Sequence, residues 1–178
     1  MDLLRGKPYV SPDLIGVSSW YTTCAMIILG IDPGIGRMGW GVIKDETGKQ
    51  VPVEFGCFET ASKESLDNRL AKIYHFVLNL IGKFKPEILA IEQLYFSANS
   101  KTALIVGQAR GVILLSAAEV NVPTISYTPL QVKQAITGYG KADKNQMQRM
   151  VTAILHLPER IVKDDTADAL AVALTHAF

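Results

Sequence analysis

The chain has 178 residues, of which 48% are hydrophobic and 20% are charged, and its formal net charge is +1. This length and composition predict one folded domain with a sizeable core and exclude wholesale disorder. No apolar run reaches the roughly 18 residues of a membrane span, and the net charge alone does not indicate a nucleic-acid-binding protein.

The first 25 residues stand apart from the rest. They contain two prolines and two acids, which do not fit the basic start and unbroken apolar stretch of a signal peptide. Met26 directly precedes the first convincing strand. We therefore expect residues 1–25 to be a loose extension or the product of a mis-assigned start, and residues 26–178 to form a single domain.

The first half of the domain reads as strands followed by a helix. Short runs rich in β-branched and aromatic residues predict strands at 27–32, 39–44 and 51–60, joined by short turns as an antiparallel meander. Apolar residues then recur at helical spacing over residues 66–84, which predicts an amphipathic helix that ends before Pro86.

The second half alternates strands and helices. We expect a buried strand at 87–92, a loop, a long helix at 101–120 and a strand at 124–127. Helix starts are predicted at Thr128-Pro129, at Asp143, and at Asp164 or Asp165. The order βββαβαβααα indicates an α/β fold with a mixed five-stranded sheet flanked by helices.

Three glycines, Gly34, Gly36 and Gly39, have the G-x-G-x-x-G spacing of a dinucleotide loop. Such a loop requires a helix directly after the third glycine, because the helix N-terminus binds the pyrophosphate. Here a strand-like segment, 40–43, follows instead. We therefore expect the glycines to form a tight hairpin beside Asp32.

Four carboxylates form the strongest candidate site. Asp32 and Glu92 each follow an apolar strand, and Asp165 and Asp168 are three residues apart, so they share one helix face. Singly, such acids are common in strand-end turns and as helix caps. Together, like charges on buried elements are tolerated when a divalent cation neutralises them, and oxygen ligands suit Mg²⁺. Two such ions could clamp a phosphodiester, with Asp32 bridging them.

Five blocks of the sequence resemble the RuvC family of Holliday-junction resolvases. They are "LGIDPG" at 29–34, "AIEQ" at 90–93, "GQARG" at 107–111, "QVKQAITGYGKADKNQM" at 131–147 and "DDTADALAVALTH" at 164–176. The resemblance implies an RNase H-like fold, a homodimer and Mg²⁺-dependent nicking of four-way DNA junctions, with Mn²⁺ as a substitute. It also implies a role in DNA recombination and repair beside branch-migration proteins.

The resemblance also assigns residues. The family's four catalytic acids correspond to Asp32, Glu92, Asp165 and Asp168, and two of its basic positions correspond to Lys133 and Lys144. An aromatic wedge that enters the junction corresponds to Tyr95, where phenylalanine is usual, and the neighbouring Phe96 could share that role. The products it implies carry 5′-phosphate and 3′-hydroxyl ends.

The distribution of charge fits a DNA-binding surface. Residues 99–149 carry six basic and two acidic residues, which gives them a local charge of +4. Lys133, Lys141 and Lys144 bracket a glycine-rich bend and are predicted to contact DNA, while any single lysine could instead lie on a solvated helix face. Tyr95 and Phe96 could stack on bases or cover the core.

Other features of the sequence are predicted to be structural. Ala103, Gly107 and Gly111 form a small-residue stripe that we expect to pack on the protein's own sheet, so the dimer rests on the resemblance. Cys24 and Cys57 lack metal-ligand spacing and are expected to be free thiols in a reducing compartment, the cytoplasm. The three histidines are not expected to be catalytic.

Three other functions remain open from the residues alone. A nuclease of the same fold could act on RNA–DNA hybrids, and substrate preference separates it from a resolvase. A sugar-kinase or actin-like ATPase also has a G-x-D-x-G loop, but it needs two such domains and a longer chain. A non-catalytic DNA-binding module would be expected to lack at least one of the four acids, and none is missing.

Overall fold

The computed structural model describes residues 25–94, 100–157 and 164–178, with side chains from residue 103 onward in the second range. The predictions for residues 1–24, Tyr95 and Phe96 lie outside these residues. The elements in chain order are β1 (Met26–Asp32), β2 (Arg37–Glu46), β3 (Lys49–Glu59), α1 (Leu66–Phe84), β4 (Ile88–Glu92), α2 (Ser100–Glu119), β5 (Thr124–Tyr127), α3 (Pro129–Thr137), α4 (Lys144–Ile154) and α5 (Asp164–Ala177). This is the predicted order βββαβαβααα.

One five-stranded mixed sheet forms the centre of the molecule, with the strand order β3-β2-β1-β4-β5. β1, β2 and β3 pair as an antiparallel meander, whereas β4 pairs with β1 and with β5 in parallel. The predicted mixed sheet is therefore confirmed. β2 begins at Arg37, two residues before the predicted start, so Gly39 lies within the strand and pairs with Asp32.

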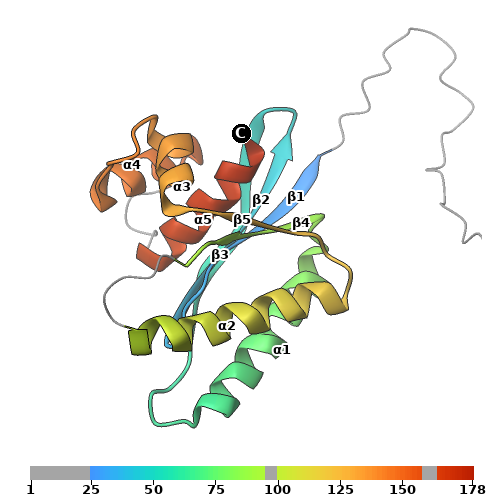
Figure 1. The fold of residues 1–178 in the computed structure, drawn as a ribbon. Coiled ribbons are helices and arrows are strands. Elements are labelled where there is room, and N and C mark those ends of the chain that lie inside the picture. The colour runs from blue at the N-terminus through green and yellow to red at the C-terminus, as the bar shows by residue number, and fades with distance from the viewer. Residues whose placement is uncertain (1–24, 95–99, 158–163) are drawn as a thin grey trace, which may run out of the picture.

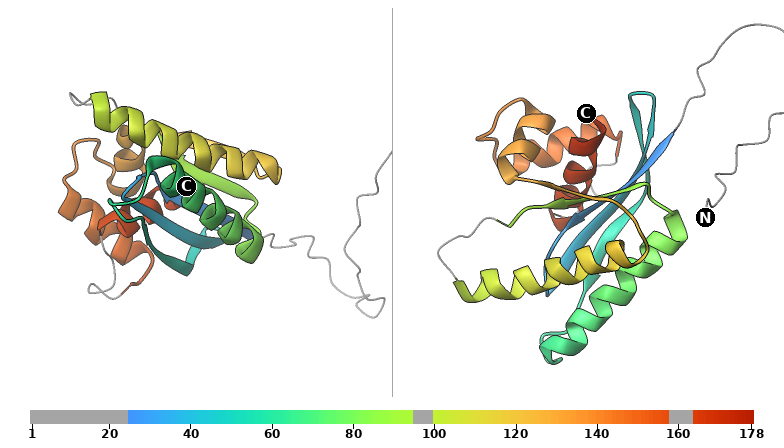
Figure 2. Two further views of the ribbon diagram at one scale, coloured as in Figure 1. Left: turned by 90° about the horizontal axis from the view of Figure 1, so that it is seen from below. Right: turned by 45° about the vertical axis from the view of Figure 1, so that its right-hand side comes forward.

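Helices cover both faces of this sheet (Figures 1 and 2). Side chains alternate between the faces because successive residues of a strand point in opposite directions. Leu29 and Ile31 of β1 pack in the core beneath α1 and α2, while Ile28 packs in the second core with α3, α4 and α5. Buried apolar side chains on both faces explain why β1 and β4 are almost continuously hydrophobic.

Local sequence signals fix the helix ends. The Thr128 hydroxyl accepts from the Gln131 backbone N–H at 3.2 Å, and Pro129 occupies the first helical position of α3. Asp143 caps α4 in the same way, accepting from the Gln146 N–H at 2.9 Å. The helix starts predicted at Thr128-Pro129 and Asp143 are thus confirmed.

The outer face of α2 differs from the prediction. A Cβ added at Gly107 would lie 3.7 Å from the Leu94 side chain, so this residue faces the protein. Gly111 is exposed, and a Cβ there would have no neighbour within 4 Å. The expectation that the whole small-residue stripe packs on the protein's own sheet is therefore wrong at Gly111. None of the helices described is long and apolar enough to cross a membrane.

Candidate active site

Asp32 and Glu92 end neighbouring parallel strands at the same edge of the sheet. Ile31 lies opposite Ile91 in the register of β1 and β4, so the next residue on each strand is one of the two acids. Both carboxylates are only partly exposed, because the apolar strands that carry them run through the core. Two like charges are thereby held beside each other in a poorly solvated position.

Close packing of α5 on the sheet brings the other two acids to this edge. α5 packs against β1, β2 and β4, and its first turn passes directly over β2. A Cβ added at Gly39 would lie 1.8 Å from the backbone oxygen of Asp165, and one at Gly30 would lie 2.2 Å from that of Ala169. Only glycine permits such an approach, so these positions determine how near Asp165 and Asp168 come to the strand ends.

The four carboxyl groups lie close enough for their charges to act on Asp32. Burial, followed in order of importance by the charges of Glu92, Asp168 and Asp165, raises the pKa of Asp32 from 3.8 to about 8. Lys144 acts in the opposite direction. An acid that is desolvated among three other acids is stabilised in its protonated form at neutral pH when no cation is present.

The same causes act on the neighbouring acids. Burial raises the pKa of Glu92 and the charge of Asp168 adds to this rise, while a hydrogen bond donated by the protonated Asp32 carboxyl and the charge of Lys133 lower it. Burial also raises the pKa of Asp168, against the opposing charge of Lys144. Burial and neighbouring acids thus raise the pKa of Asp32, Glu92 and Asp168 alike.

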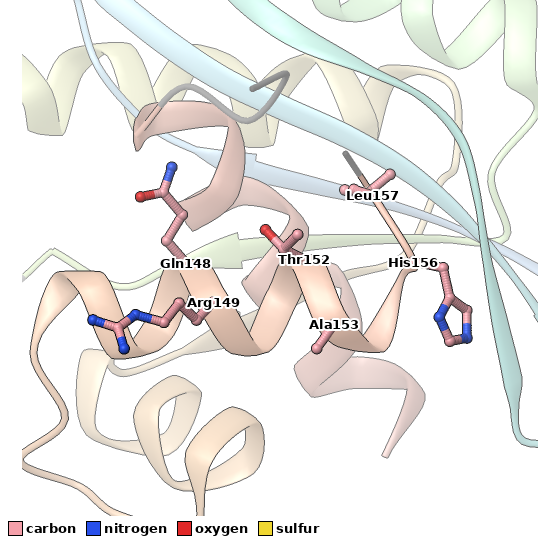
Figure 3. A pocket seen from close by; sticks show the side chains of 6 residues that line it. All are labelled: Gln148, Arg149, Thr152, Ala153, His156 and Leu157. Carbon is pink, nitrogen blue, oxygen red and sulfur yellow. The ribbon is translucent and has the colours of Figure 1, made fainter. Parts of the chain in front are cut away.

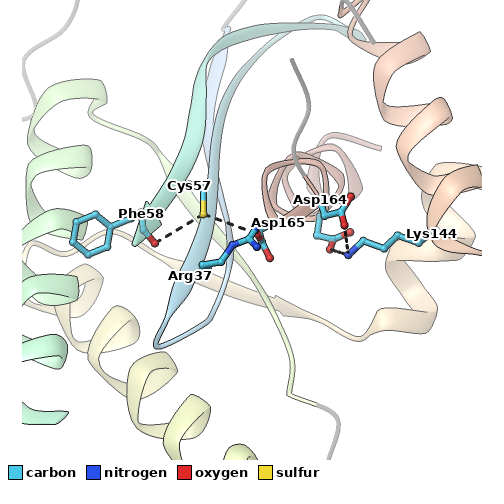
Figure 4. A network of polar contacts seen from close by, with 7 residues as sticks. Arg37, Cys57, Phe58, Lys144, Asp164 and Asp165 are labelled. Atoms are coloured by element: carbon cyan, nitrogen blue, oxygen red, sulfur yellow. Dashed lines mark hydrogen bonds and ion pairs between the residues drawn. The ribbon is translucent and has the colours of Figure 1, made fainter. Parts of the chain in front are cut away.

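Two cations flank the acids of α5 (Figure 4). The Lys144 Nζ lies 3.3 Å from Asp164 Oδ2 and 3.7 Å from Asp168 Oδ2. On the other side, Arg37 forms an ion pair with Asp165 Oδ2, and the Cys57 thiol lies 3.9 Å from that same oxygen. Lys144 was predicted from the sequence as a DNA contact, whereas Arg37 was not.

A pocket of about 210 Å³ opens between these acids and helices α3 and α4. It is lined by Glu92, Pro129, Val132, Lys133, Lys144, Met147 and Asp168. Two of the three lysines predicted to bind DNA thus border the acids. Lys141 is exposed and is not among the residues that line this pocket.

The carboxylates fit divalent cations by their chemistry, although their side chains are not preset as ligands. Across residues 25–94, 100–157 and 164–178, no group of three acid, histidine or cysteine side chains has metal-binding geometry. Asp165 is paired with Arg37, and Asp168 with Lys144. The raised pKa of Asp32 means that a bound cation would compensate the charge that this carboxyl group gains when it loses its proton.

Gly34 and Gly39 of the G-x-G-x-x-G motif have different structural roles. A Cβ at Gly34 would lie 1.9 Å from the Arg37 backbone oxygen, so the predicted tight hairpin holds there. Gly39 instead makes room for α5. The strand that follows, in place of a helix, agrees with the rejection of a dinucleotide loop.

Arg110 is a further residue that sequence reasoning left without a specific role. Its Nε donates to the backbone oxygen of Glu92 at 3.3 Å, and its Nη2 donates to Ser126 Oγ at 2.6 Å. It thereby ties the ends of β4 and β5 to α2 and holds Glu92 in place. Its position in the "GQARG" block was the only signal in the sequence.

A larger hollow of about 820 Å³ lies on the outer face of α4 (Figure 3). It is lined by Gln148, Arg149, Thr152, Ala153, His156 and Leu157, and none of these is an acid. His176 lies elsewhere, with its Nδ1 2.8 Å from the Tyr127 hydroxyl. His156 and His176 thus lie outside the cluster of acids.

Comparison with known proteins identifies relatives over most of the chain. A family model described as "Crossover junction endodeoxyribonuclease RuvC" matches residues 28–176. The curated protein of that name from Desulforamulus reducens is 50% identical over 152 residues, which are 85% of this chain and 93% of the relative. The one from Moorella thermoacetica is 51% identical and covers 85% and 91%.

Solved structures extend the match to the fold. RuvC of Thermus thermophilus, in complex with a Holliday junction substrate, superimposes with a TM-score of 0.82 at 40% identity and covers 86% of this chain and 93% of that one. The yeast mitochondrial Holliday junction resolvase Ydc2 has a TM-score of 0.61 at 18% identity, covers 84% and 78%, and shares the fold alone.

Proposed function

The chain belongs to the RuvC family of crossover junction endodeoxyribonucleases, and we propose that it resolves Holliday junctions by paired symmetric nicks. As a member of this family it is an RNase H-like hydrolase of DNA phosphodiester bonds. The observation that carries the proposal is the convergence of Asp32, Glu92, Asp165 and Asp168, from three separate elements, at one edge of the sheet.

Divalent cations belong to this family's chemistry, and the acids are suited to hold them. We assign Asp32, Glu92, Asp165 and Asp168 as the ligands of two Mg²⁺ ions, with Mn²⁺ as a substitute. When bound, such cations activate water and stabilise the leaving 3′ oxygen, which leaves 5′-phosphate and 3′-hydroxyl ends. Because the pKa of Asp32 is raised, binding of cations to these carboxyl groups should release protons.

Basic residues of α3 and α4 bind the DNA backbone in this account. Lys133 and Lys144 border the acids in one pocket and place positive charge where a phosphate would enter. Lys141 is exposed on the bend between α3 and α4 and would contact a more distant phosphate. Tyr95 and Phe96 are assigned to the junction crossover on the family pattern alone.

A homodimer suits a four-way junction, since two active sites related by a two-fold axis match the symmetry of the DNA. The outer face of α2 supports it. Leu104 and Leu115 lie three helical turns apart and are 66% and 60% exposed, with the open surface of Gly111 between them. An apolar face of this kind is rarely left in water. Branch-migration proteins are proposed as further partners on the family pattern.

Substrate preference tests the proposed function. The protein is incubated with a synthetic four-way junction, a plain duplex and an RNA–DNA hybrid of matched sequence, each with Mg²⁺ or with EDTA. Nicks restricted to the junction and to Mg²⁺ are expected. Preferential cleavage of the hybrid would identify a ribonuclease H activity instead, and binding without any cleavage would identify a non-catalytic DNA-binding module.

A further inference from the structure

Arg37 is held at a defined place beside the acids. It is the first residue of β2, directly after the turn that follows Asp32. The turn is anchored by Thr60, whose backbone N–H donates to the Gly36 oxygen at 3.0 Å, and Arg69 Nε braces the Thr60 hydroxyl at 2.8 Å. The backbone that carries Arg37 is thus tied to both β3 and α1.

The Arg37 side chain combines a contact with the site and access from solvent. It pairs with Asp165 Oδ2 while 53% of the side chain is exposed. Figure 4 shows Arg37 and Lys144 on opposite sides of the start of α5, each turned toward an acid of that helix. Asp165 and Asp168 are therefore each paired with a cation of the protein when no metal is bound.

The chemistry of the guanidinium group favours a phosphate as its second partner. Arginine presents a planar set of donors that matches two phosphate oxygens, and it remains charged at every working pH. Asp165 is assigned as a ligand of the cations that hold the DNA phosphate. A guanidinium in contact with this carboxylate therefore lies next to the position where the DNA phosphate would bind.

We propose that Arg37 is a substrate-binding residue that contacts a phosphate of the junction DNA, and that its ion pair with Asp165 competes with divalent cations for that carboxylate. The proposal rests on the proposed function, because it takes the acids as cation ligands. In the metal-free protein Arg37 is engaged by Asp165. Once Asp165 holds a cation, the guanidinium is free to bind DNA.

Salt dependence of DNA binding tests the phosphate contact. Binding of a fluorescent four-way junction and a plain duplex is measured by anisotropy between 50 and 200 mM salt, in Ca²⁺ and in EDTA, with a gel confirming intact DNA. Log K falls linearly with log salt, and loss of one phosphate contact lowers the magnitude of this slope by about 0.9. We expect this decrease for Arg37→Gln in Ca²⁺ and a smaller one in EDTA, whereas Arg37→Lys should retain most of the slope.

A matched control and a DNA-free measurement complete the test. Lys49→Gln removes an exposed cation at the opposite end of the β2–β3 hairpin and should leave the slope unchanged. Without DNA, the melting temperature is measured as Mg²⁺ is added, and the midpoint is the Mg²⁺ concentration that gives half of the full increase. This midpoint should be about two- to five-fold lower in Arg37→Gln than in the wild type, which is the factor that corresponds to one exposed ion pair.

The outcomes separate this inference from the proposed function. A wild-type slope for Arg37→Gln in Ca²⁺ would overturn the phosphate contact, and an unchanged or higher Mg²⁺ midpoint would overturn the competition. A wild-type protein that binds duplex as well as the junction would count against junction resolution, while the slope of Arg37→Gln could still be read on the duplex. If Arg37→Gln unfolds, Arg37→Met replaces it in both measurements, because it retains an unbranched stem and removes the charge.

Discussion

Asp32 and Glu92 lie one residue beyond the paired Ile31 and Ile91, so two adjacent parallel strands deliver two carboxyl groups to the same point. Nothing in either strand compensates the charge, and α5 adds Asp165 and Asp168 from above. The fold thereby holds an arrangement of acids that is unfavourable in the absence of cations. Several measurable consequences arise from this conflict.

The free energy of unfolding should change with pH in the direction opposite to that caused by an acidic group whose pKa is lowered by folding. The pKa of Asp32 is 3.8 ordinarily and about 8 in the folded protein, so between these values the folded state keeps a proton that the unfolded state has released. The free energy of unfolding in EDTA should therefore fall as pH rises from about 4 to 8. At about 1.4 kcal/mol per pKa unit, the decrease is on the order of several kcal/mol.

Asp32→Asn provides the control for this pH dependence. Denaturant unfolding of both proteins in EDTA at pH 5 and pH 8 gives the comparison. The variant should lose less stability between the two pH values and should exceed the wild type at pH 8. Equal losses in the two proteins would show that Asp32 is not the titrating group.

Gly39→Ala should disturb the site through the backbone. The new Cβ would meet the Asp165 oxygen at 1.8 Å, which displaces the first turn of α5. We expect a loss of about 2–3 kcal/mol in the free energy of unfolding and a fall in junction cleavage. Gly82→Ala is the control, since a Cβ in this part of α1 meets nothing within 4 Å and should stabilise the helix by about 0.5–1 kcal/mol. Similar effects of the two substitutions would contradict the close approach of α5.

Much of this site was predictable from the sequence, for reasons that are local. An apolar run ending in an acid indicated both Asp32 and Glu92, and residues that commonly cap helices indicated the helix starts at Thr128-Pro129 and Asp143. The pairing of Arg37 with Asp165 was not predictable, because it depends on how α5 packs across β2, over 100 residues away in the chain. No periodicity or spacing records such a contact.

The same limit applies to α2. Its stripe of small residues, Ala103, Gly107 and Gly111, favours packing within the chain. The structure leaves Leu104, Gly111 and Leu115 facing outward instead. A helix that is covered by a second copy of the chain has the same pattern as one covered by its own domain.

Leu115→Glu should weaken the dimer. A charge placed in an apolar interface must be desolvated, so we expect the dissociation constant to rise at least about ten-fold. Light scattering with size-exclusion chromatography measures the mass, and Met150→Gln on α4 serves as an exposed apolar control. A monomeric wild type, or a variant with the wild-type dissociation constant, would exclude this face of α2.

Lys144→Gln should weaken binding to the same extent for junctions of every DNA sequence. Lys144 contacts Asp164 and Asp168 and borders the pocket of the acids, so its removal takes away one phosphate contact. The magnitude of the slope of log K against log salt should decrease by about 0.9 for every junction sequence tested. A loss confined to particular sequences would indicate base recognition instead.

Cleavage of a synthetic four-way junction in Mg²⁺ by the wild type, Asp32→Asn and Asp168→Asn tests the central claim most directly. Both substitutions keep the shape of the side chain and remove a proposed ligand charge, so cleavage should fall at least about 1,000-fold while junction binding stays equal or becomes tighter. Cleavage near the wild-type rate by either variant would contradict the assignment of these carboxylates as the site of catalysis.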